Sequence, residues 1–175
     1  MVNTLKTLML SLGIFLICGT AMAADTTVGG SVAVGEGSSM AYSVNVRQTY
    51  EPWFSGEAAS LQPLMELSGF AWVDDDDTVW GASLAPGLRF TMFTTANFQP
   101  YMEGSVGGAA ISDDELDSRD LGSNVLFKTK GVVGVQFGES MRHSVQGEYT
   151  NYSTWGITNT DDGYSTVGVS YGFSF

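Results

Sequence analysis

The side chains that most often carry catalysis or bind metals are scarce in this sequence. It has one histidine, His143, and one cysteine, Cys18. A zinc-type site built from several histidines and cysteines is therefore excluded. The chain also has no glycine-rich loop followed by a lysine that would bind phosphates, so we expect neither a metal nor a cofactor.

Carboxylates are plentiful, and the formal net charge of −12 argues against nucleic acid as a partner. Many of them gather in three segments, residues 74–77, 113–120 and 161–162. We expect these segments to be solvated loops. The alternative is that they bind divalent cations that bridge the protein to anionic lipopolysaccharide.

The N-terminus has the order of a secretory signal peptide. Lys6 is followed by an apolar stretch from Leu8 to Cys18 and then by small residues around Ala23. This stretch is shorter than the roughly 18 to 20 residues that a membrane-spanning helix needs. We predict cleavage after Ala23 or Ala24, which divides the chain into a signal peptide, residues 1–24, and one domain, residues 25–175.

Apolar and polar side chains alternate along most of the mature chain, which is typical of β-strands with one apolar face. The clearest case is the C-terminal stretch, where Val167, Val169 and Tyr171 alternate with Gly168 and Ser170. Eight strands are predicted in all, at residues 26–35, 40–47, 61–73, 80–90, 98–111, 125–137, 141–153 and 166–175.

Most of these strands are near the 9 to 11 residues that a tilted strand needs to cross a bilayer, and an even number is usual in bacterial barrels. The sequence therefore predicts an all-β fold, an eight-stranded antiparallel up-and-down transmembrane β-barrel in the bacterial outer membrane. With both termini in the periplasm, the three acidic segments follow strands three, five and seven and face outward.

Charged side chains lie on the less apolar face of their strands, which indicates a polar barrel interior. In a side-chain-filled barrel such charges can pair with one another. The alternative is a soluble barrel or β-sandwich with the aromatic face turned inward, because periodicity alone does not distinguish inside from outside. The eight charges expected inside are Arg47, Glu66, Arg89, Glu103, Lys128, Lys130, Arg142 and Glu148.

The end of the chain resembles the lipid A 3-O-deacylase (PagL) family. The resemblance rests on the run from Asn151 to Gly156, Asn159, the Asp161-Asp162-Gly163 turn and the terminal alternating strand. Further matching segments, in the same order as in the family, are residues 83–86, 100–110, 121–124 and Phe127.

The resemblance implies an outer-membrane barrel that hydrolyses the acyl ester at position 3 of lipid A with a serine, a histidine and a glutamate. The family pattern is His-x-Ser with the carboxylate twelve residues after the serine. The serine maps to Ser153, the candidate nucleophile. Asn151 stands at the histidine position and Ser165 at the glutamate position. His143 is ten residues from Ser153, roughly 33 Å along one strand, and does not replace the missing base.

Two classes of function follow. One is a lipid A 3-O-deacylase-like hydrolase in which Ser153 acts with a base that the sequence does not identify. The other is a noncatalytic barrel that binds lipopolysaccharide or stabilises the envelope. In both, the expected partners are the membrane and the lipid A of its outer leaflet.

Overall fold

The computed structural model describes residues 23–74, 77–93, 97–116, 119–156 and 163–175. In this part of the chain no helix is long and apolar enough to cross a membrane. The expected signal peptide lies outside the described residues except for its last two positions, so its cleavage stays a prediction.

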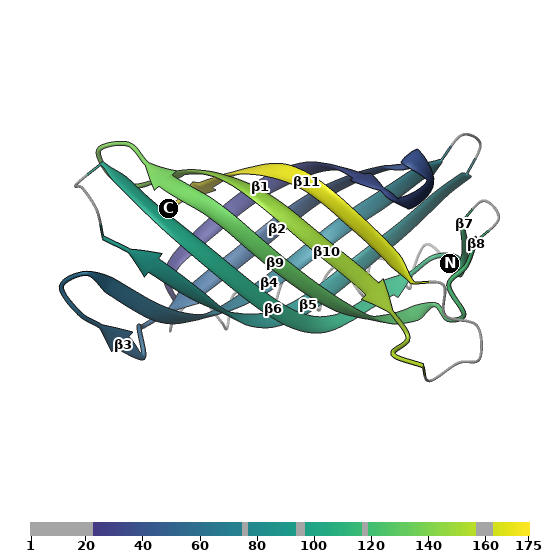
Figure 1. Cartoon of the computed structure of the whole chain (residues 1–175), viewed down its shortest axis with the longest axis horizontal. Helices are drawn as coiled ribbons and strands as arrows, with labels where there is room; N and C mark the ends of the chain where they lie inside the picture. The colour runs from purple at the N-terminus through teal and green to yellow at the C-terminus, as the bar shows by residue number, and fades with distance from the viewer. Residues whose placement is uncertain (1–22, 75–76, 94–96, 117–118, 157–162) are drawn as a thin grey trace, which may run out of the picture.

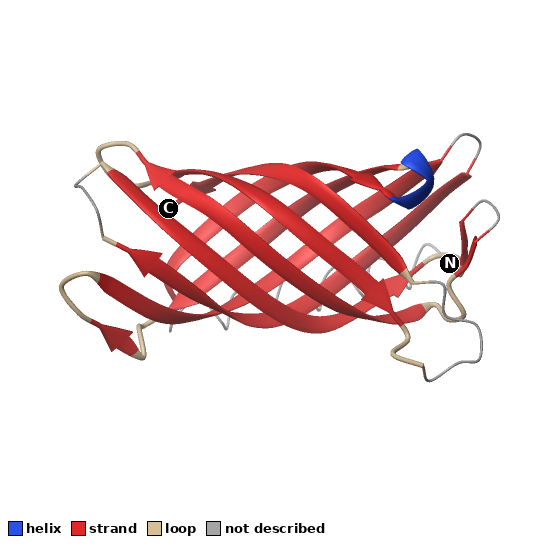
Figure 2. Cartoon of the chain, in the orientation of Figure 1, coloured by secondary structure: helices blue, strands red, loops and turns tan. Residues whose placement is uncertain are grey.

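Long antiparallel strands dominate the described residues (Figures 1 and 2). Eight of them form the wall: β1 (Ala23–Gly35), β2 (Met40–Tyr50), β4 (Ala59–Asp74), β5 (Asp77–Met92), β6 (Phe98–Ile111), β9 (Val125–Phe137), β10 (His143–Ser153) and β11 (Tyr164–Ser174). All eight predicted strands are confirmed, although several extend a few residues beyond the predicted limits.

The sheet closes on itself because β1 pairs with both β2 and β11. Every other long strand pairs with the strands that precede and follow it in the chain, always antiparallel. Closure leaves the wall no unpaired strand edge, which a bilayer would penalise. The predicted eight-stranded up-and-down barrel is confirmed.

The two ends of the barrel differ. One end, the loop end, carries η2 (Glu36–Ser38) and a small hairpin of β7 (Glu115–Leu116) and β8 (Arg119–Asp120) (Figure 1). The opposite end, the turn end, carries the C-terminus and β3 (Phe54–Ser55), which pairs with the start of β4.

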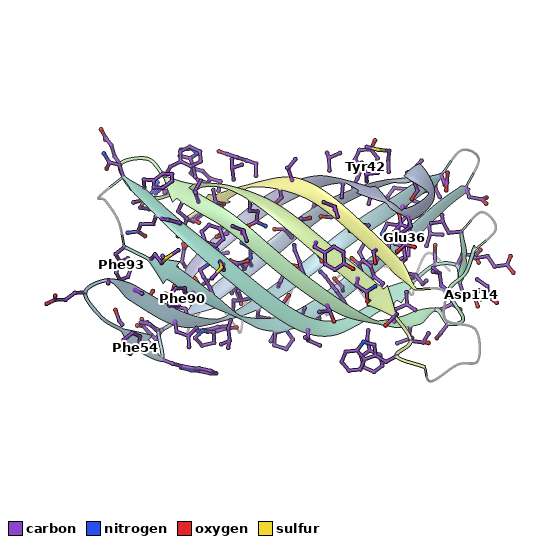
Figure 3. All side chains as sticks on the ribbon, viewed as in Figure 1. Glu36, Tyr42, Phe54, Phe90, Phe93 and Asp114 are labelled. Atoms are coloured by element: carbon purple, nitrogen blue, oxygen red, sulfur yellow. The ribbon has the colours of Figure 1, made fainter. Side chains whose placement is uncertain are left out.

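The outer wall is apolar along the middle of the strands. Large apolar side chains such as Val44, Val133 and Val169 are exposed there, and Tyr42, Phe54, Phe90 and Phe93 also project from the surface (Figure 3). The soluble alternative required this face to be buried, and it is wrong.

The interior holds a network of paired charges. Glu66 lies at its centre, with its carboxylate oxygens 3.3 Å from Arg47, 2.9 Å from Lys128 and 3.1 Å from Lys130. Nearer the turn end, Arg89 pairs with Glu103 at 2.6 Å. The remaining bridges of the network are Arg47–Glu103 and Lys130–Glu148.

Seven of the eight charges expected inside are therefore confirmed, and Arg142 is the exception. Its side chain is exposed because β10 begins only at His143, so Arg142 belongs to the turn between β9 and β10. There its backbone carbonyl accepts a hydrogen bond from Ser174 N–H.

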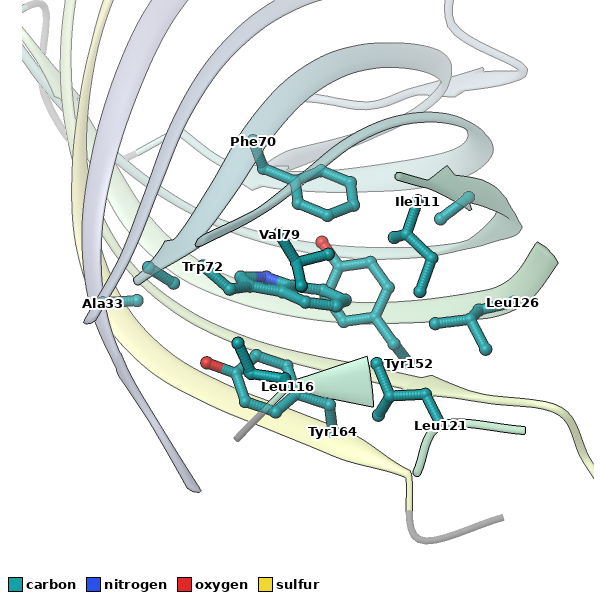
Figure 4. Packing of buried hydrophobic residues seen from close by; sticks show 12 residues of the cluster. Ala33, Phe70, Trp72, Val79, Ile111, Leu116, Leu121, Leu126, Tyr152 and Tyr164 are labelled. Carbon is teal, nitrogen blue, oxygen red and sulfur yellow. The ribbon is translucent and has the colours of Figure 1, made fainter. Parts of the chain in front are cut away.

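Aromatic side chains fill the interior towards the loop end (Figure 4). Trp72 packs against Phe70, Tyr152 and Tyr164, with ring centroids 4.4 to 4.9 Å apart. Leu116 from β7 and Leu121, which follows β8, are also buried in this cluster. The segment predicted as a solvated acidic loop therefore also covers the mouth of the barrel with apolar side chains.

Candidate lipid-facing site at the loop end

Two of the three residues singled out from the sequence, Asn151 and Ser165, meet on the outer wall, and Ser153 lies on the same face without a contact to either. Asn151 and Ser153 lie near the end of β10 and share a face with the exposed Tyr149. Ser165 lies near the start of β11, and it is the direct cross-strand partner of Asn151. The final hairpin therefore interrupts the apolar wall with a small polar patch.

Hydrogen bonds join the polar side chains of this patch. Asn151 Nδ2 donates to Ser165 Oγ at 3.0 Å. The Tyr149 hydroxyl lies 3.2 Å from the same oxygen. Ser165 thus links Tyr149 and Asn151, two outward-facing residues of β10.

Ser153 has a different environment. Its Oγ accepts a hydrogen bond from the backbone N–H of Trp155 at 3.4 Å, the two-residue spacing of a serine turn. Its partner on β9 is Phe127. The Phe127 ring stacks on that of Trp155 with centroids 4.6 Å apart and planes 11° from parallel.

A depression in the surface begins beside this aromatic pair. It has a volume of about 360 Å³ and a mostly apolar lining that includes Gly107, Gly108, Ser123, Val125, Phe127 and Thr154. Gly108 and its outward-facing neighbours Gly104 and Gly131 leave the wall smooth, because a Cβ built on any of them would meet nothing within 4 Å.

His143 lies far from the site, as expected. It begins β10 at the turn end, and its Nδ1 is 2.7 Å from the Tyr171 hydroxyl. Its ring also packs on Phe137 and Phe173. It is part of an aromatic group at the opposite end of the strand from Ser153.

The described parts of the acidic segments, Asp74, Asp77 and residues 113–116, lie at the loop end, but the divalent-cation hypothesis gains no support. Asp75, Asp76, Asp161 and Asp162 fall outside the described residues. Among the residues that are described, no three carboxylates, histidines or cysteines come together in a group that could hold a metal ion. The hypothesis stays a prediction.

Sequence reasoning did not assign Tyr149, Phe127 or Trp155 to the site. The alternation of side chains along the strand could have identified Tyr149, because Tyr149 precedes Asn151 by two residues and therefore points to the same face. The pairing of Phe127 with Trp155 had no comparable signal, because it depends on β9 lying beside β10 and on the turn that follows Ser153.

Eight strands closed around a polar interior, with an apolar outer wall, define a transmembrane β-barrel of the bacterial outer membrane. The family described as "Lipid A 3-O-deacylase (PagL)" matches residues 37–174. The chain belongs to this family.

Solved structures agree on the fold. The outer membrane enzyme PagL superposes with a TM-score of 0.77 at 22% identity, over 84% of this chain and 98% of that one. Neisserial surface protein A gives 0.60 at 12% identity, over 86% and 96%. The N-terminal β-barrel domain of Pseudomonas aeruginosa OprF gives 0.51 at 15%, over 88% and 99%. No curated protein sequence matches the chain.

Proposed function

We propose that this protein binds lipid A at the loop-end site and does not hydrolyse it by the mechanism of its family. The loop end faces outward, because bacterial barrels place their longer loops on the cell surface. Tyr149, Asn151, Ser153 and Ser165 then lie at the depth where the acylated sugars of the outer leaflet meet their hydrocarbon chains.

The Asn151–Ser165 hydrogen bond carries the proposal. A serine becomes a nucleophile when a neighbouring base accepts its proton and a third group orients that base. Asn151 and Ser165 occupy the family positions for those two roles, and neither side chain can accept a proton near neutral pH. Loss of the triad histidine reduces the rate of a serine hydrolase on the order of a million-fold.

Binding of lipid A needs neither the catalytic base nor the group that orients it. The depression beside Phe127 offers an apolar surface for an acyl chain, and the hydroxyl and amide groups of the patch can hydrogen-bond the ester and sugar oxygens next to it. A lipid can reach the patch from the surrounding leaflet, because the patch lies on the outer face of the wall, and Gly108, Val125 and Phe127 present the depression on that same face.

Hydrolysis is the second candidate, and the position of Ser153 favours it. Its hydroxyl lies on the same outward face as Asn151, beside the depression. In this mechanism Ser153 Oγ attacks the carbonyl of the 3-position ester, the sugar hydroxyl leaves, and water then releases the fatty acid from the serine. A base outside the described residues would have to accept the serine proton.

Mass spectrometry of lipid A distinguishes the two candidates. Cells would express the wild type, Ser153→Ala, or the double variant Asn151→His with Ser165→Glu, beside an empty vector. We expect unchanged lipid A with the first two and loss of one 3-position hydroxyacyl chain with the double variant, which restores a base and its carboxylate on paired positions. Deacylation by the wild type that Ser153→Ala abolishes would establish the hydrolase instead.

Binding of lipid A is measured on protein purified from the same cells. Lipid A that co-purifies with the wild-type protein is quantified per mole of protein, beside an unrelated eight-stranded barrel purified in the same detergent. We expect a clear excess over that control barrel. Equal amounts would contradict the proposal.

A further inference from the structure

Trp155 is the most unusual residue of the site. It has a positive φ of 54°, in the left-handed region that bulky side chains avoid. In the described part of the chain, Met141 is the one other non-glycine residue with a positive φ. A backbone conformation of this kind persists only where the surroundings hold it, and such positions concentrate at functional sites.

Two contacts hold Trp155 in this conformation. One face of the indole is stacked on Phe127, and the backbone N–H is bonded to Ser153 Oγ. The side chain is nevertheless 60% exposed, so much of its surface is presented outward from the loop end. The local strain therefore fixes the orientation of a flat apolar surface next to the hydroxyl of Ser153.

We propose that Trp155 is a stacking platform for a sugar ring of the glycolipid headgroup. This inference rests on the proposed function and names the part of lipid A that the platform contacts, a glucosamine ring. The axial C–H groups on one face of the ring pack against the indole, since aromatic side chains combine a large apolar face with a rigid position. Hydroxyls of the same sugar reach the polar groups of Ser153 and Asn151.

Depth in the membrane supports a sugar as the occupant. Trp155 is two residues past Ser153, the last residue of β10, so it lies beyond the strand at the level of the headgroups. Trp80 provides the contrast at the same end of the barrel. It is 64% exposed but lies within β5 and has no left-handed backbone. That is the arrangement of an ordinary interfacial tryptophan.

Saturation-transfer NMR tests the platform. The probe is the β-1,6-linked glucosamine disaccharide without acyl chains, added to the full barrel in a detergent that contains no sugar. We expect transfer to the ring protons, strongest at the axial protons H1, H3 and H5 that share one face. The signal should disappear in Trp155→Ala, persist at reduced size in Trp155→Phe and stay unchanged in Trp80→Ala. Folding of each variant is checked by its heat-modifiable migration on a gel.

The outcomes separate this inference from the proposed function. Undiminished transfer in folded Trp155→Ala, or an equal loss in Trp80→Ala, would overturn the platform. Lipid A that co-purifies with the wild type while the disaccharide shows no transfer would overturn the platform and leave lipid A binding in place. If neither ligand binds, both proposals fail.

Discussion

Asn151 and Ser165 face each other across the last hairpin of the barrel, and the amide of the first donates a hydrogen bond of 3.0 Å to the hydroxyl of the second. The positions that carry a histidine and a glutamate in the family pattern are therefore still coupled here, but by a neutral bond. A neutral bond holds the strands and the site in shape without providing a base.

Binding at this site should not depend on pH in the neutral range, because neither Asn151 nor Ser165 titrates there. We expect lipid A retention by the wild type to change less than about twofold between pH 5.5 and 8, a range in which histidine is the side chain that ordinarily changes charge. The double variant Asn151→His with Ser165→Glu should hydrolyse faster as the pH rises, because only the neutral imidazole accepts a proton. A steep pH profile for the wild type would point to another titrating group.

Filling the depression should weaken lipid binding. Gly108→Leu places a side chain on the smooth part of the wall, where a Cβ meets no other atom. We expect the lipid A that co-purifies to fall several-fold while the unfolding midpoint in urea stays close to that of the wild type. Val169→Leu, on the exposed wall of β11, is the matched control and should leave the lipid content unchanged. Equal retention in both variants would show that the depression is not used.

Removing the central carboxylate of the interior should destabilise the barrel. Glu66 is 2% exposed and is within 3.3 Å of Arg47, Lys128 and Lys130. Glu66→Gln leaves these cations without a shared counter-charge, and we expect a loss of about 3 to 5 kcal/mol in the free energy of unfolding. Glu57→Gln, at an exposed position, should change it by less than about 0.5 kcal/mol. Both values come from urea titrations in lipid vesicles.

Two glycines of the wall should respond differently to the same added methyl group. A Cβ on Gly168 would overlap the backbone of Val32 and Ala33 on β1, so Gly168→Ala forces neighbouring strands apart. We expect it to cost about 1 to 3 kcal/mol, the usual range for overpacking. Gly131→Ala adds its methyl group to open space and should be tolerated. Similar unfolding midpoints for the two variants would contradict the close packing of β11 against β1.

Most of the fold was predictable because alternation is a local property of the sequence. The eight strands and seven of the interior charges follow from the alternation of apolar and polar side chains alone. The prediction that Arg142 points inward was wrong, because the alternation of side chains does not show at which residue a strand begins. The aromatic cluster was missed for a related reason. Phe70 and Trp72 have the same parity as Glu66, but an apolar side chain on the polar face becomes informative only once its partners on other strands are known.

The site was predictable only in part. Asn151, Ser153 and Ser165 could be identified from the family pattern, and strand pairing brings Asn151 and Ser165 together. Phe127 and Trp155 meet through a contact between a strand and the turn after its neighbour. Nothing in the spacing of two such residues encodes a stacked pair or the left-handed backbone that supports it.

The filled interior determines how a ligand can arrive. Paired charges occupy the middle of the barrel, and Trp72, Leu116 and Leu121 occupy the space beneath the mouth at the loop end. The described residues therefore leave a lipid no route through the lumen. Under the proposed function, lipid A would reach Ser153 by lateral diffusion, in a two-dimensional encounter whose frequency depends on the surface density of lipid A and the fluidity of the leaflet rather than on any concentration in water.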